Sequence, residues 1–349
     1  MRKYYDITNM LNTNAEYMML LGQRSNGKSY QAKKVCIEEA LRGKKFIYLR
    51  RWKADIKQRD VTAYFEDMPV FRLTVGKWQH IRAINGNLYF VNLETDGTIK
   101  EKEEIGRYCA LNEHERYKSQ VFKGYGTILY EEFITDETYL VDEPRLLQQY
   151  VSTVARLDKI RVILVGNTLT RVCPYFNEWA LEGVLRQKQG TIELYHYHED
   201  DGEFVTIAVE YCENMNAKNT MFFGQSAKQI ISGEWDVKEV PKLPREKDKY
   251  EKVYEILIQY QSFKFVLELL VEKEEGGVIC FVYPHTKRRK IYRIISDEFS
   301  DLPNVTSRLD RTRRPEEIIR NLLILDKICF SDNLTGSDFK KVLNNMQIY

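Results

Sequence analysis

The order of apolar and polar residues predicts a parallel sheet covered by helices. Residues 29–41 place apolar side chains at helical spacing, and Gly43 follows as a stop signal. Four short apolar runs without alternation are typical of strands buried on both faces. These runs are residues 18–21, 46–49, 127–130 and 162–165. Alternation of such strands with helices argues for a mostly parallel sheet with helices on both faces.

A different pattern occupies residues 71–93, between the second and third runs. We expect a strand-rich insertion there, because alternating residues flank Asn85-Gly86, a strong hairpin turn signal.

The pattern changes again in the C-terminal third. Asn, Gly and Lys become frequent over residues 213–249, and 241–249 has the composition of a linker. Within this segment, residues 219–231 are expected to form a small helical lid. Beyond it we expect strands and then a helix that begins near Pro315. The strands are expected at 263–271, 277–283 and 290–295, and the helix at 315–330.

Composition narrows the class of protein. A chain of 349 residues can hold two domains, and 43% hydrophobic with 30% charged residues is ordinary for a globular protein. The net charge of +2 gives no global basic field, so any nucleic-acid surface must be local. The six cysteines lack CxxC spacing, so the sequence indicates neither a zinc ribbon nor a disulfide framework. With no signal peptide and no apolar run of membrane length, we expect no membrane partner and a cytoplasmic protein, including the cytoplasm of an infected host.

The loop after the first strand is the main candidate for chemistry. Residues 22–29, GQRSNGKS, match the P-loop pattern GxxxxGK[ST] at every defined position, between a predicted strand and a predicted helix. Lys28 would reach the β- and γ-phosphates, and the Ser29 hydroxyl would ligate Mg²⁺. The loop would turn backbone N–H groups toward the phosphates at the N-terminus of the helix. The predicted nucleotide-binding residues are Gly22, Arg24, Ser25, Asn26, Gly27, Lys28 and Ser29.

Carboxylates follow the third strand in the Walker B arrangement. Glu131 would steady the Mg²⁺ shell, and Glu132 would orient and polarise an attacking water, which favours hydrolysis over phosphoryl transfer to another substrate. The alternative is a strand that ends in a solvated acidic turn. Asn167, at the end of the fourth strand, could touch both the γ-phosphate and the water, although Gly-Asn is also ordinary turn chemistry.

Basic residues suggest further roles, each with a solvated side chain as the alternative. Arg24 could reach a phosphate or a neighbouring subunit. Arg156 precedes the fourth strand, where an arginine of a ring ATPase can act on the neighbour's nucleotide in trans. The basic residues after the second strand are candidates for contacts with DNA backbone phosphates: Arg50, Arg51, Lys53, Lys57 and Arg59.

Taken in order, several of these stretches resemble the DNA-packaging (encapsidation) ATPases of phi-twenty-nine-like small podophages, reduced relatives of the large terminase subunit. The stretches are GQRSNGKSYQ, KKFIYLRRWK, TILYEEF, STVAR, LVGN and CPYF. The resemblance is densest over residues 22–176. It implies a homo-oligomeric ring, a pentamer in this group, which uses ATP to drive double-stranded DNA through the portal into a preformed capsid. Such a protein would work in the host cytoplasm, transiently attached to the procapsid.

The resemblance also assigns roles to residues. The family's Walker lysine falls on Lys28, its catalytic glutamate on Glu132 and its trans-acting arginine on Arg156. One position departs from the family: Glu131 stands where the family has an aspartate. Its carboxylate is one methylene longer, so it could meet Mg²⁺ differently.

The fold class that follows is α/β. We expect a P-loop ASCE-type ATPase domain with a mostly parallel sheet over 1–212, a linker or lid over 213–249, and a ribonuclease H-like α+β domain over 250–349. A nuclease of that type needs clustered carboxylates that hold two metal ions. The available acidic residues show no such pattern, so we expect a vestigial domain without nuclease activity. They are Glu268, Glu272, Asp297, Asp301 and Asp310. His196 and His198 are expected to be a surface pair.

Two basic runs in the last domain suit RNA or DNA, with Tyr283 and Tyr292 nearby. One contains Lys287, Arg288 and Arg289, and the other spans 308–314. The resemblance implies a packaging RNA as a candidate partner, and a solvated face is the alternative. Two other functions remain open: a P-loop helicase or translocase without a capsid role, and a non-catalytic, RNA-anchored structural protein.

Overall fold

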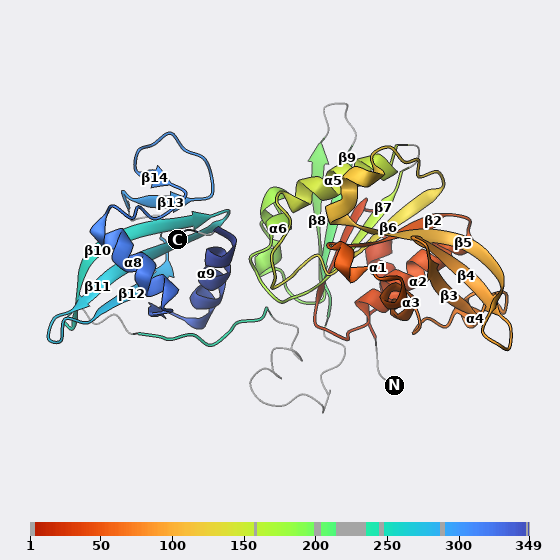
Figure 1. Cartoon of the computed structure of the whole chain (residues 1–349), viewed down its shortest axis with the longest axis horizontal. Coiled ribbons are helices and arrows are strands. Elements are labelled where there is room, and N and C mark those ends of the chain that lie inside the picture. The colour runs from red at the N-terminus through yellow and green to blue at the C-terminus, as the bar shows by residue number, and fades with distance from the viewer. Residues whose placement is uncertain are drawn as a thin grey trace. The chain divides into compact units, whose positions relative to one another are not determined.

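The computed structural model describes residues 4–156, 159–198, 204–213, 235–243, 248–286, 290–346 and 348, and all structural statements below concern these residues. The chain forms two compact units (Figure 1). The first contains Met1–Leu169 and Glu178–Trp235, and the second contains Thr170–Asn177 and Asp236–Tyr349. The expected division at 212 and 249 stays a proposal.

A mixed, mostly parallel sheet forms the centre of the first unit. Its described strands lie in the order β3-β4-β5-β2-β6-β7-β1-β9-β8. All neighbours from β5 to β9 are parallel, whereas β3, β4 and β8 are antiparallel to their neighbours. The strands are β1 (Tyr17–Gly22), β2 (Lys45–Arg50), β3 (His80–Ile84), β4 (Asn87–Leu93), β5 (Ile99–Ala110), β6 (Tyr125–Glu131), β7 (Arg161–Asn167), β8 (Thr191–His198) and β9 (Phe204–Tyr211).

Helices cover both faces of this sheet, as the sequence predicts. The longest are α2 (Lys28–Leu41) and α5 (Glu143–Val154). The apolar side of α2 packs with Met18, Phe46 and Leu129 in one core cluster, while α5 buries Leu147 and Tyr150 on the other side (Figure 1). The shorter helices are α1 (Thr8–Leu11), η1 (Lys53–Asp55), α3 (Gln58–Tyr64), α4 (Val70–Leu73), η2 (Leu111–Tyr117), α6 (Pro174–Glu178) and η3 (Val184–Arg186).

The four buried strands predicted from the apolar runs are confirmed as β1, β2, β6 and β7. Strand β7 lies between β1, which carries the P-loop, and β6, which carries the acidic pair. The predicted turn at Asn85-Gly86 joins β3 to β4, and both residues have positive φ, as a type I′ hairpin turn requires. The start of the predicted strand-rich insertion is wrong, because residues 71–73 belong to helix α4, which follows Pro69 at its N-cap.

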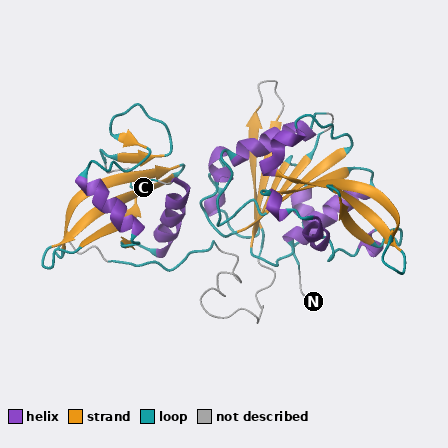
Figure 2. Ribbon diagram, in the orientation of Figure 1, coloured by secondary structure: helices purple, strands orange, loops and turns teal. Residues whose placement is uncertain are grey.

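The second unit contains a six-stranded sheet in the order β14-β13-β10-β11-β12-β15, counted over the described residues. Strands β10, β11 and β12 are antiparallel, and β13 and β15 add parallel strands on either side. Helices α8 and α9 pack on one face of this sheet, around Phe339 and Ile319 (Figure 2). The elements are β10 (Tyr250–Tyr260), β11 (Phe263–Glu272), β12 (Val278–Pro284), β13 (Ile294–Ser296), β14 (Val305–Thr306), α8 (Arg314–Ile324), β15 (Ile328–Phe330) and α9 (Asn333–Met346).

This arrangement is the ribonuclease H-like α+β class expected, but the element boundaries differ. The helix predicted over 315–330 is wrong at its end. It stops at Ile324, Asp326 takes a positive φ of 51°, and β15 then pairs with β12. Strand β10 and helix α9 were not predicted. The predicted lid at 219–231 lies outside the described residues.

None of the helices in the described part of the chain combines the length and apolarity that crossing a membrane requires.

Candidate nucleotide-binding site

The carboxyl ends of three parallel strands bring the predicted site residues together. Gly22 at the end of β1 aligns with Asn167 at the end of β7, and Glu131 at the end of β6 aligns with Val165. In open α/β sheets, this edge is where ligands bind.

The P-loop connects β1 directly to α2. Gly22 and Gly27 have φ of 145° and 104°, values that glycine adopts without the steric cost of a side chain. Gln23 and Asn26 are buried, and the Asn26 amide donates to the Glu213 carbonyl at 3.0 Å. Arg24 and Ser25 are exposed. The loop therefore has a fixed base and an accessible tip before the N-terminus of α2.

Lys28 is buried at the base of this loop, with 4% of its surface exposed. Its Nζ donates to the Gln23 carbonyl at 2.5 Å and lies 3.4 Å from Asn167 Oδ1. Burial lowers the pKa of Lys28 to about 8, against the opposing effects of Cys212 and Glu131. The structure thus joins Lys28 and Asn167, which the sequence predicted separately.

Glu131 is buried and both of its carboxylate oxygens have partners. Ser29 Oγ donates to Oε2 at 3.2 Å, and the Tyr64 hydroxyl donates to Oε1 at 2.6 Å. Burial raises the pKa of Glu131, and the hydrogen bonds from Tyr64 and Ser29 oppose that rise. A hydroxyl and a carboxylate this close are the hard oxygen donors that Mg²⁺ prefers, so the residues present fit that ion.

Glu132 differs from its neighbour because its side chain is 58% exposed. Its backbone has a φ of 58°, which turns the chain sharply after β6. Arg50, at the end of β2, donates to Glu132 Oε2 at 2.6 Å. The carboxylate is therefore accessible to solvent but held by an ion pair.

A second arginine supports the turn that carries Glu132. Arg51 donates to the carbonyls of Glu132 and Phe133 at 3.1 and 2.7 Å, and it pairs through two nitrogens with the buried Glu143. From the sequence, Arg50 and Arg51 were placed among the basic residues that could contact DNA, not beside the acidic pair, and Tyr64 was given no role. The only signal was that both arginines directly follow the second predicted strand.

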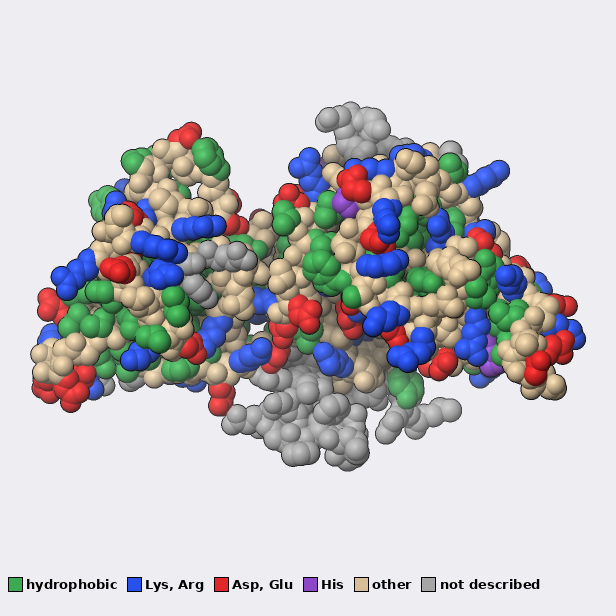
Figure 3. All heavy atoms as spheres, viewed as in Figure 1, with side chains coloured by type: hydrophobic (Ala, Val, Ile, Leu, Met, Phe, Trp, Pro, Cys, Tyr) green, Lys and Arg blue, Asp and Glu red, His purple; other side chains and the backbone are tan. Residues whose placement is uncertain are grey.

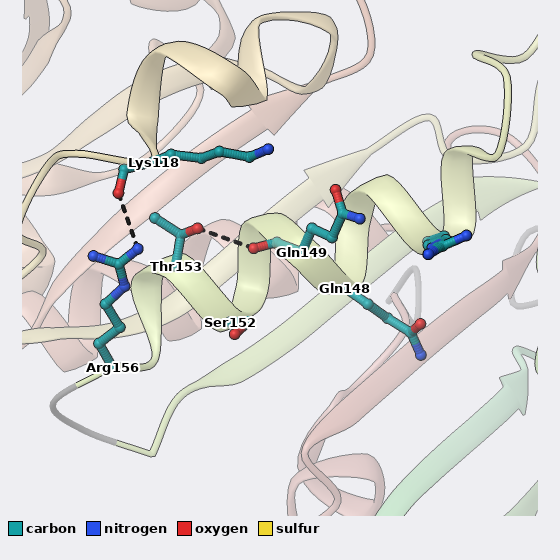
Figure 4. A pocket seen from close by; sticks show the side chains of 7 residues that line it. Lys118, Gln148, Gln149, Ser152, Thr153 and Arg156 are labelled. Carbon is teal, nitrogen blue, oxygen red and sulfur yellow. Dashed lines mark hydrogen bonds between the residues drawn. The ribbon is translucent and has the colours of Figure 1, made fainter.

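Arg156 lies elsewhere on the first unit. It follows α5 and precedes β7, so it sits near the amino end of that strand, opposite the edge that holds the P-loop. Its side chain is exposed, and Nη2 donates to the Lys118 carbonyl at 2.9 Å (Figure 4). Together with Gln148 and Ser152 of α5, these two residues line an open hollow of about 500 Å³.

The basic residues predicted to contact DNA follow β2, on the same sheet edge as the P-loop. Lys53 pairs with Glu113 at 3.1 Å, and Arg59, with 92% of its side chain exposed, lies 3.5 Å from Asp60. Lys57 is also exposed. Basic and acidic side chains alternate over the visible face of each unit (Figure 3). Lys287, Arg288 and Arg289 lie outside the described residues.

Three of the acidic residues considered for a nuclease site in the second unit have individual partners. Glu268 is buried and accepts from the Tyr283 hydroxyl at 2.9 Å, Glu272 pairs with Lys249, and Asp310 pairs with Arg313. His196 and His198 are both exposed on β8. Within the described ranges, no group of three or more His, Cys, Asp or Glu could hold a metal ion. The lack of nuclease activity stays a prediction.

Fold and site together define a P-loop nucleotide-binding protein of the ASCE type. The podovirus DNA encapsidation protein (Gp16) family matches residues 1–194, more than half of the chain. The chain therefore belongs to this family.

Individual relatives agree with that assignment. A DNA packaging protein of Bacillus phage B103 is 28% identical over 162 residues, which are 45% of this chain and 46% of the relative. The match thus spans about half the length of that relative.

Two solved structures share the fold over the whole chain. The Phi-28 gp11 DNA packaging motor is 13% identical with a TM-score of 0.52, covering 100% of this chain and 99% of its own. The bacteriophage Phi-29 viral genome packaging motor assembly is 20% identical with a TM-score of 0.55, covering 97% and 99%.

Proposed function

We propose that this chain hydrolyses ATP as a subunit of an oligomeric ring that drives double-stranded viral DNA through the portal into a preformed capsid. The observation that carries the proposal is a cluster at the carboxyl edge of the sheet, where Lys28 lies beside Asn167 and Ser29 contacts Glu131. Glu132 follows Glu131 at the same edge. Membership of the encapsidation family and the fold of two packaging motors support the same function.

The P-loop would bind the triphosphate. Lys28 Nζ now donates to a carbonyl of the loop, an interaction that a phosphate oxygen would replace with a charged acceptor. Ser29 and Glu131 would hold Mg²⁺, which would supply positive charge to offset that of the triphosphate. Asn167, which lies beside Lys28, would contact the γ-phosphate.

Glu132 would orient the attacking water and accept its proton, because its carboxylate is exposed at the end of β6. To act in this way, the Glu132 carboxylate must give up its ion pair with Arg50 and accept a hydrogen bond from the water instead. Arg156 would complete the site of a neighbouring subunit in trans, since it lies at the opposite edge of its own sheet.

The partners of the ring belong to the same proposal. Lys53, Lys57 and Arg59 would contact DNA backbone phosphates, which demand positive charge but no base recognition. Five subunits and a packaging RNA are the assembly that the resemblance implies. The protein would act in the host cytoplasm, attached to the procapsid.

Substitution of Glu132 tests the proposed hydrolysis. Glu132→Gln should bind ATP normally, because Lys28 and Ser29 are intact. It should hydrolyse ATP about 10²–10⁴-fold more slowly, because the water loses its base. The measurement is steady-state phosphate release beside nucleotide binding by calorimetry. Glu66→Gln, at an exposed carboxylate of the same unit, should change neither quantity. Near-normal turnover of Glu132→Gln would refute the assignment.

A further inference from the structure

The neighbour of the proposed base, Glu131, has a partner that the usual P-loop parts do not include. Its Oε1 accepts a hydrogen bond of 2.6 Å from the hydroxyl of Tyr64, the last residue of α3. Its Oε2 accepts from Ser29 Oγ at 3.2 Å. Each carboxylate oxygen of Glu131 therefore accepts from a different hydroxyl, and Oε2 is the one that contacts the P-loop residue Ser29.

The aromatic ring of Tyr64 is held from several sides. It stacks on Tyr48 with centroids 4.6 Å apart and meets Phe65 edge-on at 5.0 Å. The Lys33 ammonium lies 4.4 Å from the ring centroid and also donates to the Tyr64 carbonyl at 2.7 Å. Lys33 is itself buried and paired with Asp67. With ring and backbone both fixed, the hydroxyl of Tyr64 has little freedom to leave Glu131.

We propose that Tyr64 is a positioning residue that sets the orientation of Glu131 toward the metal. A glutamate has one more rotatable bond than an aspartate, so its carboxylate can miss a metal site in more ways. The hydrogen bond to Oε1 removes that freedom and leaves Oε2 beside the Ser29 hydroxyl. Groups that orient a metal-ligating carboxylate in this way typically contribute 10- to 100-fold to metal affinity. The proposal rests on the proposed function, because it assumes that Ser29 and Glu131 hold the metal.

Tyr64→Phe removes the hydroxyl and keeps the ring. In the full chain with ADP bound, Mn²⁺ affinity measured by electron paramagnetic resonance should fall at least about 10-fold. ADP affinity in the presence of a chelator should stay unchanged, and the thermal unfolding midpoint should fall only by the amount expected for one lost hydrogen bond to a buried group. The matched control is Tyr125→Phe, which removes a phenol oxygen from another buried tyrosine of the first unit. It should leave Mn²⁺ affinity intact.

Repeating Tyr64→Phe in a Glu131→Ala chain distinguishes positioning of Glu131 from a general effect of the substitution on the structure. In a Glu131→Ala chain, Mn²⁺ binds weakly, and adding Tyr64→Phe should weaken it no further. The same fold-loss in both backgrounds would overturn the proposal, as would unchanged Mn²⁺ affinity of Tyr64→Phe in the otherwise native chain. Failure of the unsubstituted chain to bind ADP and Mn²⁺ would instead refute the proposed function.

Discussion

Arg51 and Glu143 form a buried ion pair beneath the proposed catalytic turn. Their side chains are 6% and 0% exposed, and the guanidinium contacts both carboxylate oxygens. The Glu143 carboxylate also accepts from Tyr130, while Arg51 holds two carbonyls after β6. Nearly all of the hydrogen-bonding capacity of the pair is used. The pair therefore fixes the backbone from which Glu132 projects.

Glu143→Ala should destabilise the first unit strongly, by about 3–5 kcal/mol, because it leaves the Arg51 charge buried without its partner. The four tryptophans, Trp52, Trp78, Trp179 and Trp235, all belong to the first unit. Urea unfolding followed by tryptophan fluorescence therefore reports on that unit.

The control for this prediction is Glu38→Ala. Glu38 forms an exposed pair with Lys34 one helical turn away, a type of contact that contributes only about 0.3–0.5 kcal/mol. If the two variants lost the same free energy of unfolding, burial of the Arg51–Glu143 pair would not be the cause of the large effect.

The sequence predicted individual site residues only where a local pattern of residue types indicates their chemistry. Lys28 and Ser29 follow from the P-loop pattern, and Glu131 and Glu132 from two carboxylates after an apolar run. Tyr64 lies 67 residues from Glu131 along the chain, and only the packing of α3 against the sheet brings them together. No local pattern encodes such a contact.

At the scale of elements, strands buried on both faces were the most predictable. Nearly uniform apolar runs form β1, β2, β6 and β7, so the local sequence alone indicates that these strands are buried. Strand β10 was missed because its first half is charged and exposed, and only its second half is buried. The boundary between α8 and β15 was missed because residues 322–330 are apolar on both sides of Asp326 and Lys327, a pattern that a continuing helix also allows. The positive φ of Asp326 ends the helix there.

Helix α9 contains a carboxylate whose titration should affect the stability of the second unit. Asp338 pairs with Arg171 at 3.1 Å, but burial raises its pKa to about 6, and Arg171 opposes that rise only in part. The unfolded chain would release this proton near pH 4. The folded state therefore binds the proton more tightly, and this group makes the second unit less stable as the pH rises from about 4 to about 6.

Asp338→Asn should remove that contribution and keep an acceptor for Arg171. Between pH 4 and pH 6, the free energy of unfolding of the native second unit should fall by on the order of 2–3 kcal/mol relative to that of the variant. Calorimetric unfolding of both proteins across this interval measures the difference. Asp301→Asn, at an exposed carboxylate, is the control. Parallel pH profiles for the native chain and Asp338→Asn would contradict the prediction.

At the scale of the whole molecule, the position of Arg156 agrees with the role proposed for it in the site of a neighbouring subunit. It lies at the amino edge of the sheet, and the P-loop lies at the carboxyl edge. In the proposed ring, a guanidinium at the amino edge would act on the site of a neighbour and not on its own. Trans-acting arginines contribute roughly 10³–10⁵-fold to turnover in phosphoryl transfer.

Mixing two inactive variants tests this arrangement. Arg156→Ala subunits keep a complete Glu132, and Glu132→Gln subunits keep a complete Arg156. Mixed rings should therefore recover part of the ATP hydrolysis, because some interfaces join the two intact residues. The measurement is the ATPase rate across mixing ratios, with DNA present and ring assembly checked independently. A flat baseline in assembled mixed rings would refute the trans role, since an arginine acting in its own subunit cannot be supplied by a neighbour.

The path of the chain at Asn167 has a consequence for genetics. Only Thr168 and Leu169 separate Asn167 from Thr170, the first residue of the second unit, a span of at most about 11 Å. Val172 is then fully buried in the apolar core of that unit before the chain returns at Glu178. A gene truncated after codon 212 would encode Val172 without the core that covers it. Recombination at a single junction therefore cannot exchange the second unit between related genes. An exchange that keeps its core intact must transfer two separate pieces of coding sequence.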